Sequence, residues 1–377
     1  MSPRYRSLNY TWEAVYAADF TLDHVRRRGA MIAAGVVARG WSCLVAYDTR
    51  FMGNLFARAL YADLLARGVQ ARLAACPTPL PAVYAALERK LADCALVVTA
   101  RKRPYYYNGL VLIAPPPGMT LGVPDEQPQS SFPPLIDPAP LPPDLPDLRA
   151  EYLESLRGVV DLDLIRRVSM TIFVDPMNGT TAGGFTALLG DGGQTRAIEI
   201  NREPDPHFAK VTPHPAESGL LRLKKLVRES DSHLGLAISA DGTALAVIDK
   251  SGEQVNLTEV ALLLSSYLVR QHRHKGLVLL PPPASDTAFN AARLAAWEEA
   301  TGIKLELTLD TDARIAELLA QDRPGLLLGL NRDGEISIGR VAAYPDALLA
   351  GLLVTEMVAR SGGSLRALLD AQRDQLK

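Results

Sequence analysis

Twelve of the chain's 27 prolines fall between Pro115 and Pro146. Proline has no backbone N–H and fixes φ, so this density excludes a helix and favours extended or polyproline conformation. We therefore expect a proline-rich linker at residues 115–146, which ends one domain at residue 114 and begins the next at residue 147. The linker is interpreted as a semi-rigid spacer, and the alternative is a strap that binds a proline-recognition groove.

Apolar periodicity on both sides of the linker indicates an α/β protein. Asp93–Val98 and Thr171–Val174 are apolar runs typical of buried strands. Leu148–Leu156 and Gly219–Ser230 repeat apolar residues at helical spacing. With 377 residues, 48% of them hydrophobic, the chain is long enough for two or three globular domains.

A run of three cations directly follows the first of these strands, in the sequence Thr99-Ala100-Arg101-Lys102-Arg103-Pro104. Open α/β sheets bind their ligands at the carboxyl ends of strands. This position makes Arg101, Lys102 and Arg103 candidates for binding phosphate, sulfate or a phosphorylated sugar. The alternative is that all three side chains extend into solvent, as short basic runs commonly do.

Segments that carry a family resemblance are spread over the chain: Val45–Phe51, Pro77–Val83, Tyr107–Gly109, Val174–Gly179 with Gly183-Gly184, Asn201–Asp205, Pro213–Glu217, Leu257–Val269 and Asp346–Leu369. They resemble the α-D-phosphohexomutases, the phosphoglucomutase and phosphomannomutase family. The resemblance implies three consecutive α/β/α domains, each with a mixed sheet between helices. We place them at residues 1–114, 147–255 and 256–377.

The resemblance also implies a reaction, and the basic loop departs from what that reaction needs. Family members move a phosphoryl group between two hydroxyls of a hexose phosphate by way of a phosphoserine. Arg101 stands at the phosphoserine position here, and Lys102 and Arg103 replace the next histidine and asparagine. A guanidinium is not nucleophilic at neutral pH and forms no stable phosphate ester. We therefore expect no catalytic residue at this position.

A second departure concerns the metal. The family holds Mg²⁺ with three aspartates in a loop that corresponds to Ser239–Ala244. Asp241 is the only carboxylate left at a ligand position, because Ser239 and Thr243 replace the other two. Mg²⁺ is usually held by carboxylates together with phosphate and water, so we expect no metal and no other cofactor.

Two interpretations of Asp241 remain. The dipeptide Asp241-Gly242 is typical of a tight turn, which here would join strands at Leu234–Ile238 and Ala244–Ile248. In the other interpretation, Arg101 or Lys102 points towards Asp241 and fills the space of the missing metal.

Two further motifs of the family are changed. Tyr10 and Glu13 stand where an N-terminal motif has a phosphate-facing serine and an arginine. Leu330–Glu335 takes the place of the loop that grips sugar hydroxyls. The fourth domain, which binds the distal phosphate of the substrate, would follow Lys377, and we expect it to be absent.

These departures predict a catalytically degenerate homologue, or pseudoenzyme, with a scaffold, assembly or anion-sensing role. The alternative is a Mg²⁺-dependent intramolecular phosphotransferase of carbohydrate metabolism with altered or residual activity, which could use another hydroxyl such as that of Ser239 or Thr243. A phosphorylated sugar or other anion is the expected small-molecule partner.

Charge and composition limit the classes of partner that we expect the protein to bind. A net charge of −2 gives no general reason to bind nucleic acid, and no membrane span or signal peptide is visible. Three cysteines without metal-ligand spacing predict reduced thiols and a cytoplasmic location. A homo-oligomer or protein partner could use the face left by the missing domain. Val354, Met357 and Val358 are candidates for that face, with core packing as the alternative.

Overall fold

The computed structural model describes residues 8–114, 144–283, 290–321 and 325–375. It divides into two compact units. The first unit contains residues 1–152 together with the short segments Asn178–Thr180 and Pro204–Pro213, and the second contains the rest. Most of the predicted linker, residues 115–143, lies outside the described residues. The predicted boundary between residues 255 and 256 falls inside the second unit and stays a prediction.

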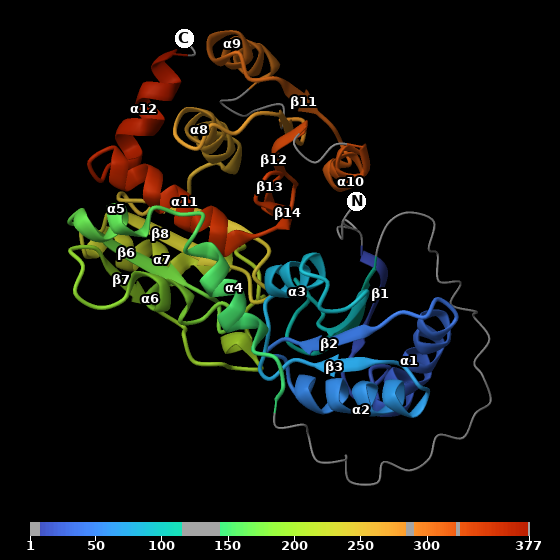
Figure 1. Cartoon of the computed structure of the whole chain (residues 1–377). Helices are drawn as coiled ribbons and strands as arrows, with labels where there is room; N and C mark the ends of the chain where they lie inside the picture. Colours follow the sequence, from blue (N-terminus) through green and yellow to red (C-terminus); the bar gives the residue numbers. More distant parts are fainter. Residues whose placement is uncertain (1–7, 115–143, 284–289, 322–324, 376–377) are drawn as a thin grey trace. The chain divides into compact units, whose positions relative to one another are not determined.

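The first unit contains a five-stranded mixed sheet in the order β1-β5-β4-β2-β3 (Figure 1). Its strands are β1 (Leu8–Val15), β2 (Cys43–Tyr47), β3 (Ala71–Leu73), β4 (Cys94–Val98) and β5 (Tyr107–Ile113). Its helices are α1 (Leu22–Val37), α2 (Gly53–Ala66) and α3 (Leu80–Glu88). Strand β4 pairs in parallel with β2 and antiparallel with β5. The loop that follows β4 therefore begins at the middle of the sheet.

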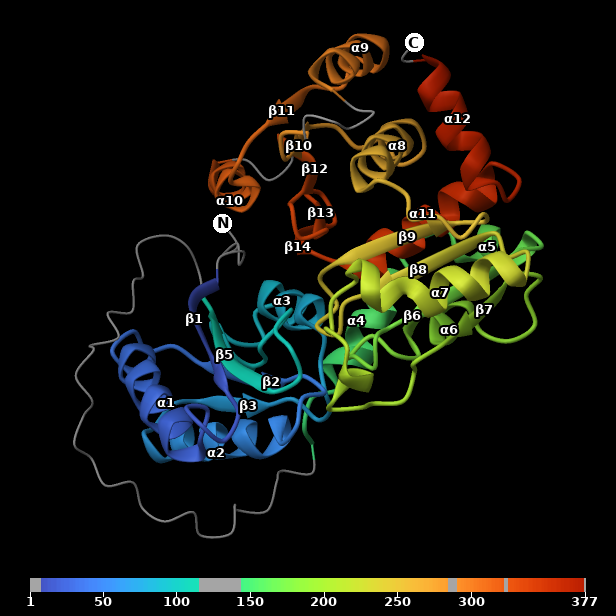
Figure 2. The same cartoon turned by 180° about the vertical axis from the view of Figure 1, so that it is seen from behind.

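Burial explains why β2 and β4 read as continuous apolar runs. All five residues of each strand are buried, because α1 and α2 cover one face of the sheet and α3 covers the other (Figures 1 and 2). Gly109 in β5 is required by close packing, since a Cβ there would lie 2.5 Å from the Thr99 carbonyl oxygen and 2.8 Å from that of Trp12.

The second unit contains two further mixed sheets, in the orders β7-β6-β8-β9 and β11-β10-β12-β13-β14. The strands of the first are β6 (Thr171–Asp175), β7 (Arg196–Glu199), β8 (Leu234–Ile238) and β9 (Leu245–Asp249). Those of the second are β10 (Leu277–Leu280), β11 (Leu305–Leu307), β12 (Leu326–Leu330), β13 (Ile336–Ile338) and β14 (Ala342–Pro345). The three mixed sheets confirm the predicted fold class.

Helix α4 (Leu148–Leu156) begins in the first unit and ends in the second, whose own helices are α5 (Leu162–Arg167), α6 (Gly184–Leu189), α7 (Glu217–Glu229), α8 (Leu257–Arg270), α9 (Ala291–Thr301), α10 (Thr311–Gln321), α11 (Ala347–Arg360) and α12 (Leu365–Gln375). Figure 2 shows α7 lying across β6 and β8. Leu220, Leu223 and Val227 of α7 pack against apolar side chains of that sheet.

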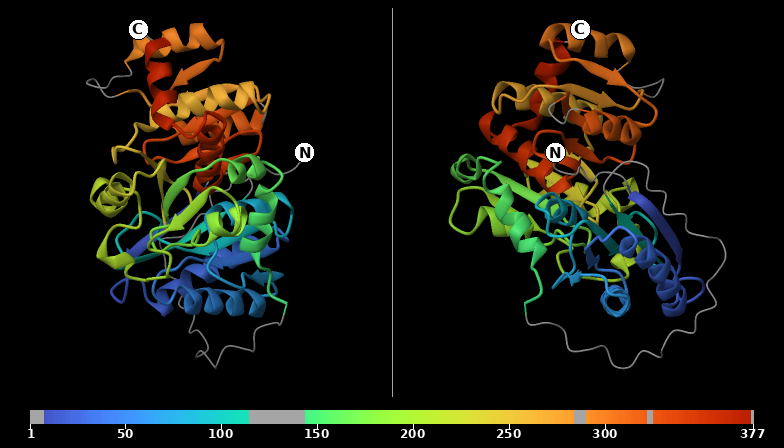
Figure 3. Two further views of the ribbon diagram at one scale, coloured as in Figure 1. Left: turned by 90° about the vertical axis from the view of Figure 1, so that its left-hand side faces the viewer. Right: turned by 45° about the vertical axis from the view of Figure 1, so that its right-hand side comes forward.

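Helix α11 is buried along almost its whole length, from Ala347 to Ala359. It packs against β8 and β9 on one side and against α8 and β13 on another, so it joins the two sheets of the second unit (Figure 3). A helix that is apolar all round is expected in such a position. Val354, Met357 and Val358 are all buried, so the prediction that they form an exposed partner-binding face is wrong and the core-packing alternative is confirmed.

Predicted elements agree with the observed ones to within a few residues. The strand pair around Asp241-Gly242 is present as the antiparallel pair β8 and β9. Helix α7 begins at Glu217 rather than Gly219. Across the described residues, none of the helices has the length and apolar character needed to span a membrane. All three cysteines are free thiols.

Candidate functional site

The basic loop, residues Thr99–Pro104, begins where the central strand β4 ends. Thr99 is fully buried, and its hydroxyl donates a hydrogen bond of 2.6 Å to Oδ2 of Asp48. The same hydroxyl accepts the backbone N–H of Arg101 at 3.1 Å. Thr99 therefore fixes the start of the loop against the end of the neighbouring strand β2.

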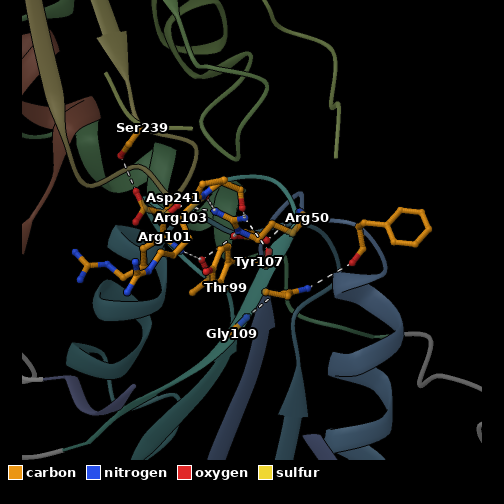
Figure 4. Close-up of polar contacts among 12 residues, drawn as sticks. Arg50, Thr99, Arg101, Arg103, Tyr107, Gly109, Ser239 and Asp241 are labelled. Atoms are coloured by element: carbon orange, nitrogen blue, oxygen red, sulfur yellow. Dashed lines mark hydrogen bonds and ion pairs between the residues drawn. The ribbon is translucent and has the colours of Figure 1, made fainter. Parts of the chain in front are cut away.

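Arg50 holds the rest of the loop by its backbone (Figure 4). One guanidinium nitrogen donates to the carbonyl oxygens of Pro104 and Tyr107, each at 2.9 Å. The other donates to the carbonyl oxygens of Arg101 and Arg103, at 2.8 and 2.7 Å. Four carbonyls thus converge on one cation, so the part of the loop that follows Thr99 is held through its backbone.

The Arg50 charge is buried and compensated. Its side chain is 1% exposed, and its Nε lies 3.3 Å from Oδ2 of Asp48, whose side chain is 4% exposed. The guanidinium also lies over the ring of Phe208, 5.2 Å from its centroid. Phe208 belongs to the segment Pro204–Pro213, which packs with the first unit although its chain neighbours belong to the second. In the sequence, Asp48 and Arg50 are noticed only as part of a family resemblance. Their role in holding the basic loop has no local sequence signal.

The three cations of the loop differ in their surroundings. Arg101 is half-buried and adopts a left-handed backbone conformation with φ of 49°, whereas Lys102 and Arg103 are exposed. Arg103 Nε donates to Oε2 of Glu13 at 2.5 Å, and this carboxylate raises the pKa of Arg103. Arg103 is therefore both exposed and ion-paired, and the choice between an anion-binding loop and three solvent-facing cations stays a prediction.

Glu13 and Arg103 both occupy positions at which the sequence departs from its family resemblance. They lie 90 residues apart in the chain and meet because β1 pairs with β5. Their charges are opposite, so the two changes compensate each other. The sequence contains both residues but no local signal that pairs them.

In the second unit, the turn Ser239–Ala244 links β8 to β9. Oδ1 of Asp241 accepts three hydrogen bonds: from the Ser239 hydroxyl at 2.6 Å, from the Thr243 N–H at 3.1 Å and from the Thr243 hydroxyl at 2.9 Å. The Ser239 N–H also bonds to the Ala244 carbonyl at 2.9 Å, and Gly242 adopts φ of 85°. The interpretation of Asp241 as a turn residue is confirmed.

Ser239 and Thr243, which we align with two aspartates of the family's metal loop, thus donate hydrogen bonds to Asp241, which we align with the third aspartate. The Thr243 hydroxyl also lies 3.0 Å from Oε1 of the buried Glu335, whose other oxygen accepts from the Asn331 amide at 2.8 Å. Among the described residues, no group of three or more His, Cys, Asp or Glu side chains is placed to hold a metal ion. These residues do not fit a three-carboxylate Mg²⁺ site. The expectation that no metal binds stays a prediction.

Arg101 and Lys102 belong to the first unit and Asp241 belongs to the second. The hypothesis that one of these cations occupies the metal position beside Asp241 therefore also stays a prediction.

Comparisons with known proteins agree with the fold. Residues 10–127 match the family model described as phosphoglucomutase/phosphomannomutase, alpha/beta/alpha domain I. Residues 150–252 match the model of alpha/beta/alpha domain II of the same family. Together the two matches cover more than half of the chain.

Similar proteins include a phosphoglucosamine mutase from Chromohalobacter salexigens, 27% identical over 95% of this chain and 77% of that protein. A phosphoglucomutase/phosphomannomutase from Thermococcus kodakarensis is 26% identical over 87% of this chain and 70% of its own length. A crystal structure from Thermus thermophilus, assigned provisionally to the phosphomannomutases, has a TM-score of 0.83 and 23% identity, covering 100% of this chain and 85% of that one. The structural likeness supports the fold alone.

Proposed function

Because the chain belongs to the phosphoglucomutase/phosphomannomutase family, we propose that it is a non-catalytic member that uses the basic loop to bind the anionic part of a phosphorylated sugar. One observation carries the proposal: Arg101 stands at the nucleophile position of a loop whose backbone is still held in place, by Arg50. The scaffold of the site is retained, and the residue that would carry the phosphoryl group is not.

Loss of the reaction follows from the chemistry of the side chain. Phosphoryl transfer through the enzyme needs an oxygen that attacks phosphorus and later leaves, and a guanidinium offers none. The second supporting point is the turn Ser239–Ala244, whose carboxylate accepts hydrogen bonds from Ser239 and Thr243. Without charge neutralisation by a metal, the transferring phosphoryl group would lose a main source of stabilisation.

Charge supports anion binding. Within the first unit, the loop and the residues that hold it carry the cations Arg50, Arg101, Lys102 and Arg103 against the carboxylates Glu13 and Asp48. The net positive charge lies at the carboxyl end of a central strand, where α/β sheets bind ligands. Guanidinium groups pair well with phosphate through charge-assisted hydrogen bonds. We propose that this binding needs no metal.

A coupled assay tests the loss of catalysis. The substrates are the 1-phosphates of glucose and mannose and the 6-phosphate of glucosamine, each with Mg²⁺. We expect no turnover above that of a heat-denatured sample. Turnover that disappears on Ser239→Ala or Thr243→Val would contradict the proposal and favour a mutase with altered chemistry, as the similar proteins named as mutases would suggest.

Isothermal titration calorimetry tests anion binding. Glucose 1-phosphate and inorganic phosphate are titrated into the full chain with and without EDTA, and we expect heat in both conditions. The double variant Arg101→Gln/Lys102→Gln should weaken binding at least about tenfold, which corresponds to about 1.4 kcal/mol. Arg39→Gln, on the same unit and remote in sequence from the loop, is the matched control. Absence of heat with the wild-type protein would leave a scaffold or assembly role and remove the anion-binding one.

A further inference from the structure

A pocket lined by aromatic side chains opens on the first unit next to the basic loop in sequence. Its walls include Tyr16, Phe51, Tyr105, Tyr106, Tyr107 and His207, and its volume is about 180 Å³. We call it the aromatic pocket. Sites for drug-sized ligands usually measure about 300–1,000 Å³. This pocket is therefore better suited to one or a few side chains of a peptide segment.

The rings of the aromatic pocket pack against one another and keep open faces. Tyr16 and Phe51 meet edge to face at 5.2 Å between ring centroids, and Tyr105 lies 5.6 Å from His207. Phe51 nevertheless remains 44% exposed and Tyr106 48% exposed. Clustered exposed aromatic rings mark surfaces that bind other groups.

His207 is held in position by the segment that carries it. Asp205 accepts the N–H of His207 at 2.9 Å and that of Ala209 at 2.8 Å, and these bonds lower the pKa of Asp205. Phe208 is buried under Arg50, which anchors the same segment. The part of the pocket wall that His207 forms is thus held in place by the protein itself, without a ligand.

Tyrosine hydroxyls add polar groups to the apolar surface. In the part of the chain that the structure describes, Tyr105 and Tyr106 make ring contacts, and neither hydroxyl forms a hydrogen bond. Aromatic grooves with such donors recognise polyproline segments, because proline rings pack on the aromatic faces while the segment's carbonyls have no internal donors.

The chain itself contains a segment of this chemistry. Residues 115–143 contain eleven prolines, the three acids Asp125, Glu126 and Asp137, and no lysine, arginine or histidine. The basic loop Thr99–Pro104 immediately precedes Tyr105, so the segment and the surroundings of the pocket have opposite charges.

Both ends of this segment are attached to the unit that carries the pocket. Ala114, at its start, is buried at the end of β5. At its other end, the Pro146 carbonyl accepts the Ala75 N–H at 3.1 Å, and Leu145 packs against the core of the unit. Strand β5 separates Ala114 from Tyr107 by roughly 20 Å, whereas 29 residues in polyproline conformation can span about 90 Å. The segment can therefore reach the pocket.

We propose that the aromatic pocket binds the proline-rich segment 115–143 of the same chain. Because both ends of the segment are anchored on the first unit, binding is intramolecular and benefits from a high effective concentration. Apolar stacking on Tyr105 and Tyr106 supplies the contact, and the charges of the basic loop favour the acidic segment. This inference is independent of the proposed function.

Limited proteolysis of the full chain tests the proposal. Chymotrypsin at low concentration cleaves after Leu121 and Leu135, the two leucines of the segment that are not followed by proline, only when the segment is released. We expect the double variant Tyr105→Ala/Tyr106→Ala to be cleaved there about tenfold faster than wild type. The matched control is Leu65→Ala, which truncates another exposed apolar side chain of the first unit, on α2, and should cleave at the wild-type rate.

A second variant tests the same prediction without changing the folded unit, so faster cleavage cannot be explained by unfolding of the pocket. Pro138→Ser/Pro140→Ser changes the segment without creating a chymotrypsin site and leaves the described unit intact, and it should also accelerate cleavage, as should raising the salt concentration. Equal cleavage rates in wild type and both double variants would overturn the proposal. Protection that is lost on diluting the wild-type protein would also overturn it, because the occupant would then be the segment of a second copy.

Discussion

The basic loop Thr99–Pro104 and the turn Ser239–Ala244 both follow buried strands, and we predict that both have lost the family's reactive residues, but they are held in different ways. The loop is held from outside, by the guanidinium of Arg50 on its carbonyls. The turn is held from inside, by the hydroxyls of Ser239 and Thr243 on Asp241. A loop held by its backbone tolerates changes of its side chains, whereas a turn held by its side chains takes its stability from the replacements themselves.

The largest expected loss of stability comes from removing Arg50, which holds the basic loop from outside. Arg50→Ala removes the cation and breaks the buried ion pair with Asp48, so the first unit should lose about 3–5 kcal/mol of unfolding free energy. Urea unfolding followed by tryptophan fluorescence measures the change, since Trp12 and Trp41 lie in this unit. Arg103→Gln, an exposed cation on the loop itself, is the control and should cost well under half as much. Equal losses would mean that the loop depends on its own side chains.

An intermediate loss of stability is expected from removing the Thr243 hydroxyl, which holds the turn Ser239–Ala244 from inside. Thr243→Val keeps the side-chain shape and removes a hydroxyl that lies within hydrogen-bond distance of both Asp241 and Glu335, so we expect a loss of about 1–3 kcal/mol. Thr308→Val is the control, because Thr308 makes only a backbone hydrogen bond within the described residues of the same unit. A thermal unfolding series measures both. A change no larger than that of the control would remove the distinction between turn and loop.

The smallest effect concerns the compensated pair Glu13–Arg103. A double-mutant cycle with Glu13→Gln and Arg103→Gln should give a coupling energy of about 0.2–1 kcal/mol, as for other exposed ion pairs. Glu13→Arg alone should destabilise the protein by bringing two guanidinium groups together, and Arg103→Asn should relieve that cost. Zero coupling would mean that the two positions changed independently.

Local patterns in the sequence predicted most of the secondary structure of this protein. Apolar runs predicted β4 and β6, and helical spacing predicted α4 within the bounds that the structure gives. The dipeptide Asp241-Gly242 predicted its own turn. Strands, helices and tight turns depend on residues that are close together in the sequence. Their apolar spacing and turn preferences can therefore be recognised from a few consecutive positions.

Contacts between distant residues could not be predicted in this way. Arg50 reaches carbonyls of residues 51 to 57 positions away, and Glu13 reaches Arg103 across 90. The residues of α11 left open whether Val354 and Met357 form an exposed stripe or pack in the core, and the structure shows that the helix is buried between two sheets. Each of these outcomes depends on which elements the topology brings together.

Short motifs and apolar periodicity were enough to indicate the family and the α/β fold class, and they predict that Arg101, Ser239 and Thr243 stand where the family's reaction needs other groups. Three contacts became apparent in the folded protein alone: Arg50 supports the loop, Glu13 compensates Arg103, and Phe208 lies under the buried cation. This division arises because residue identity limits the chemistry that a position can perform. Hydrogen-bond partners and charge compensation are set by chain segments that meet only in the folded protein.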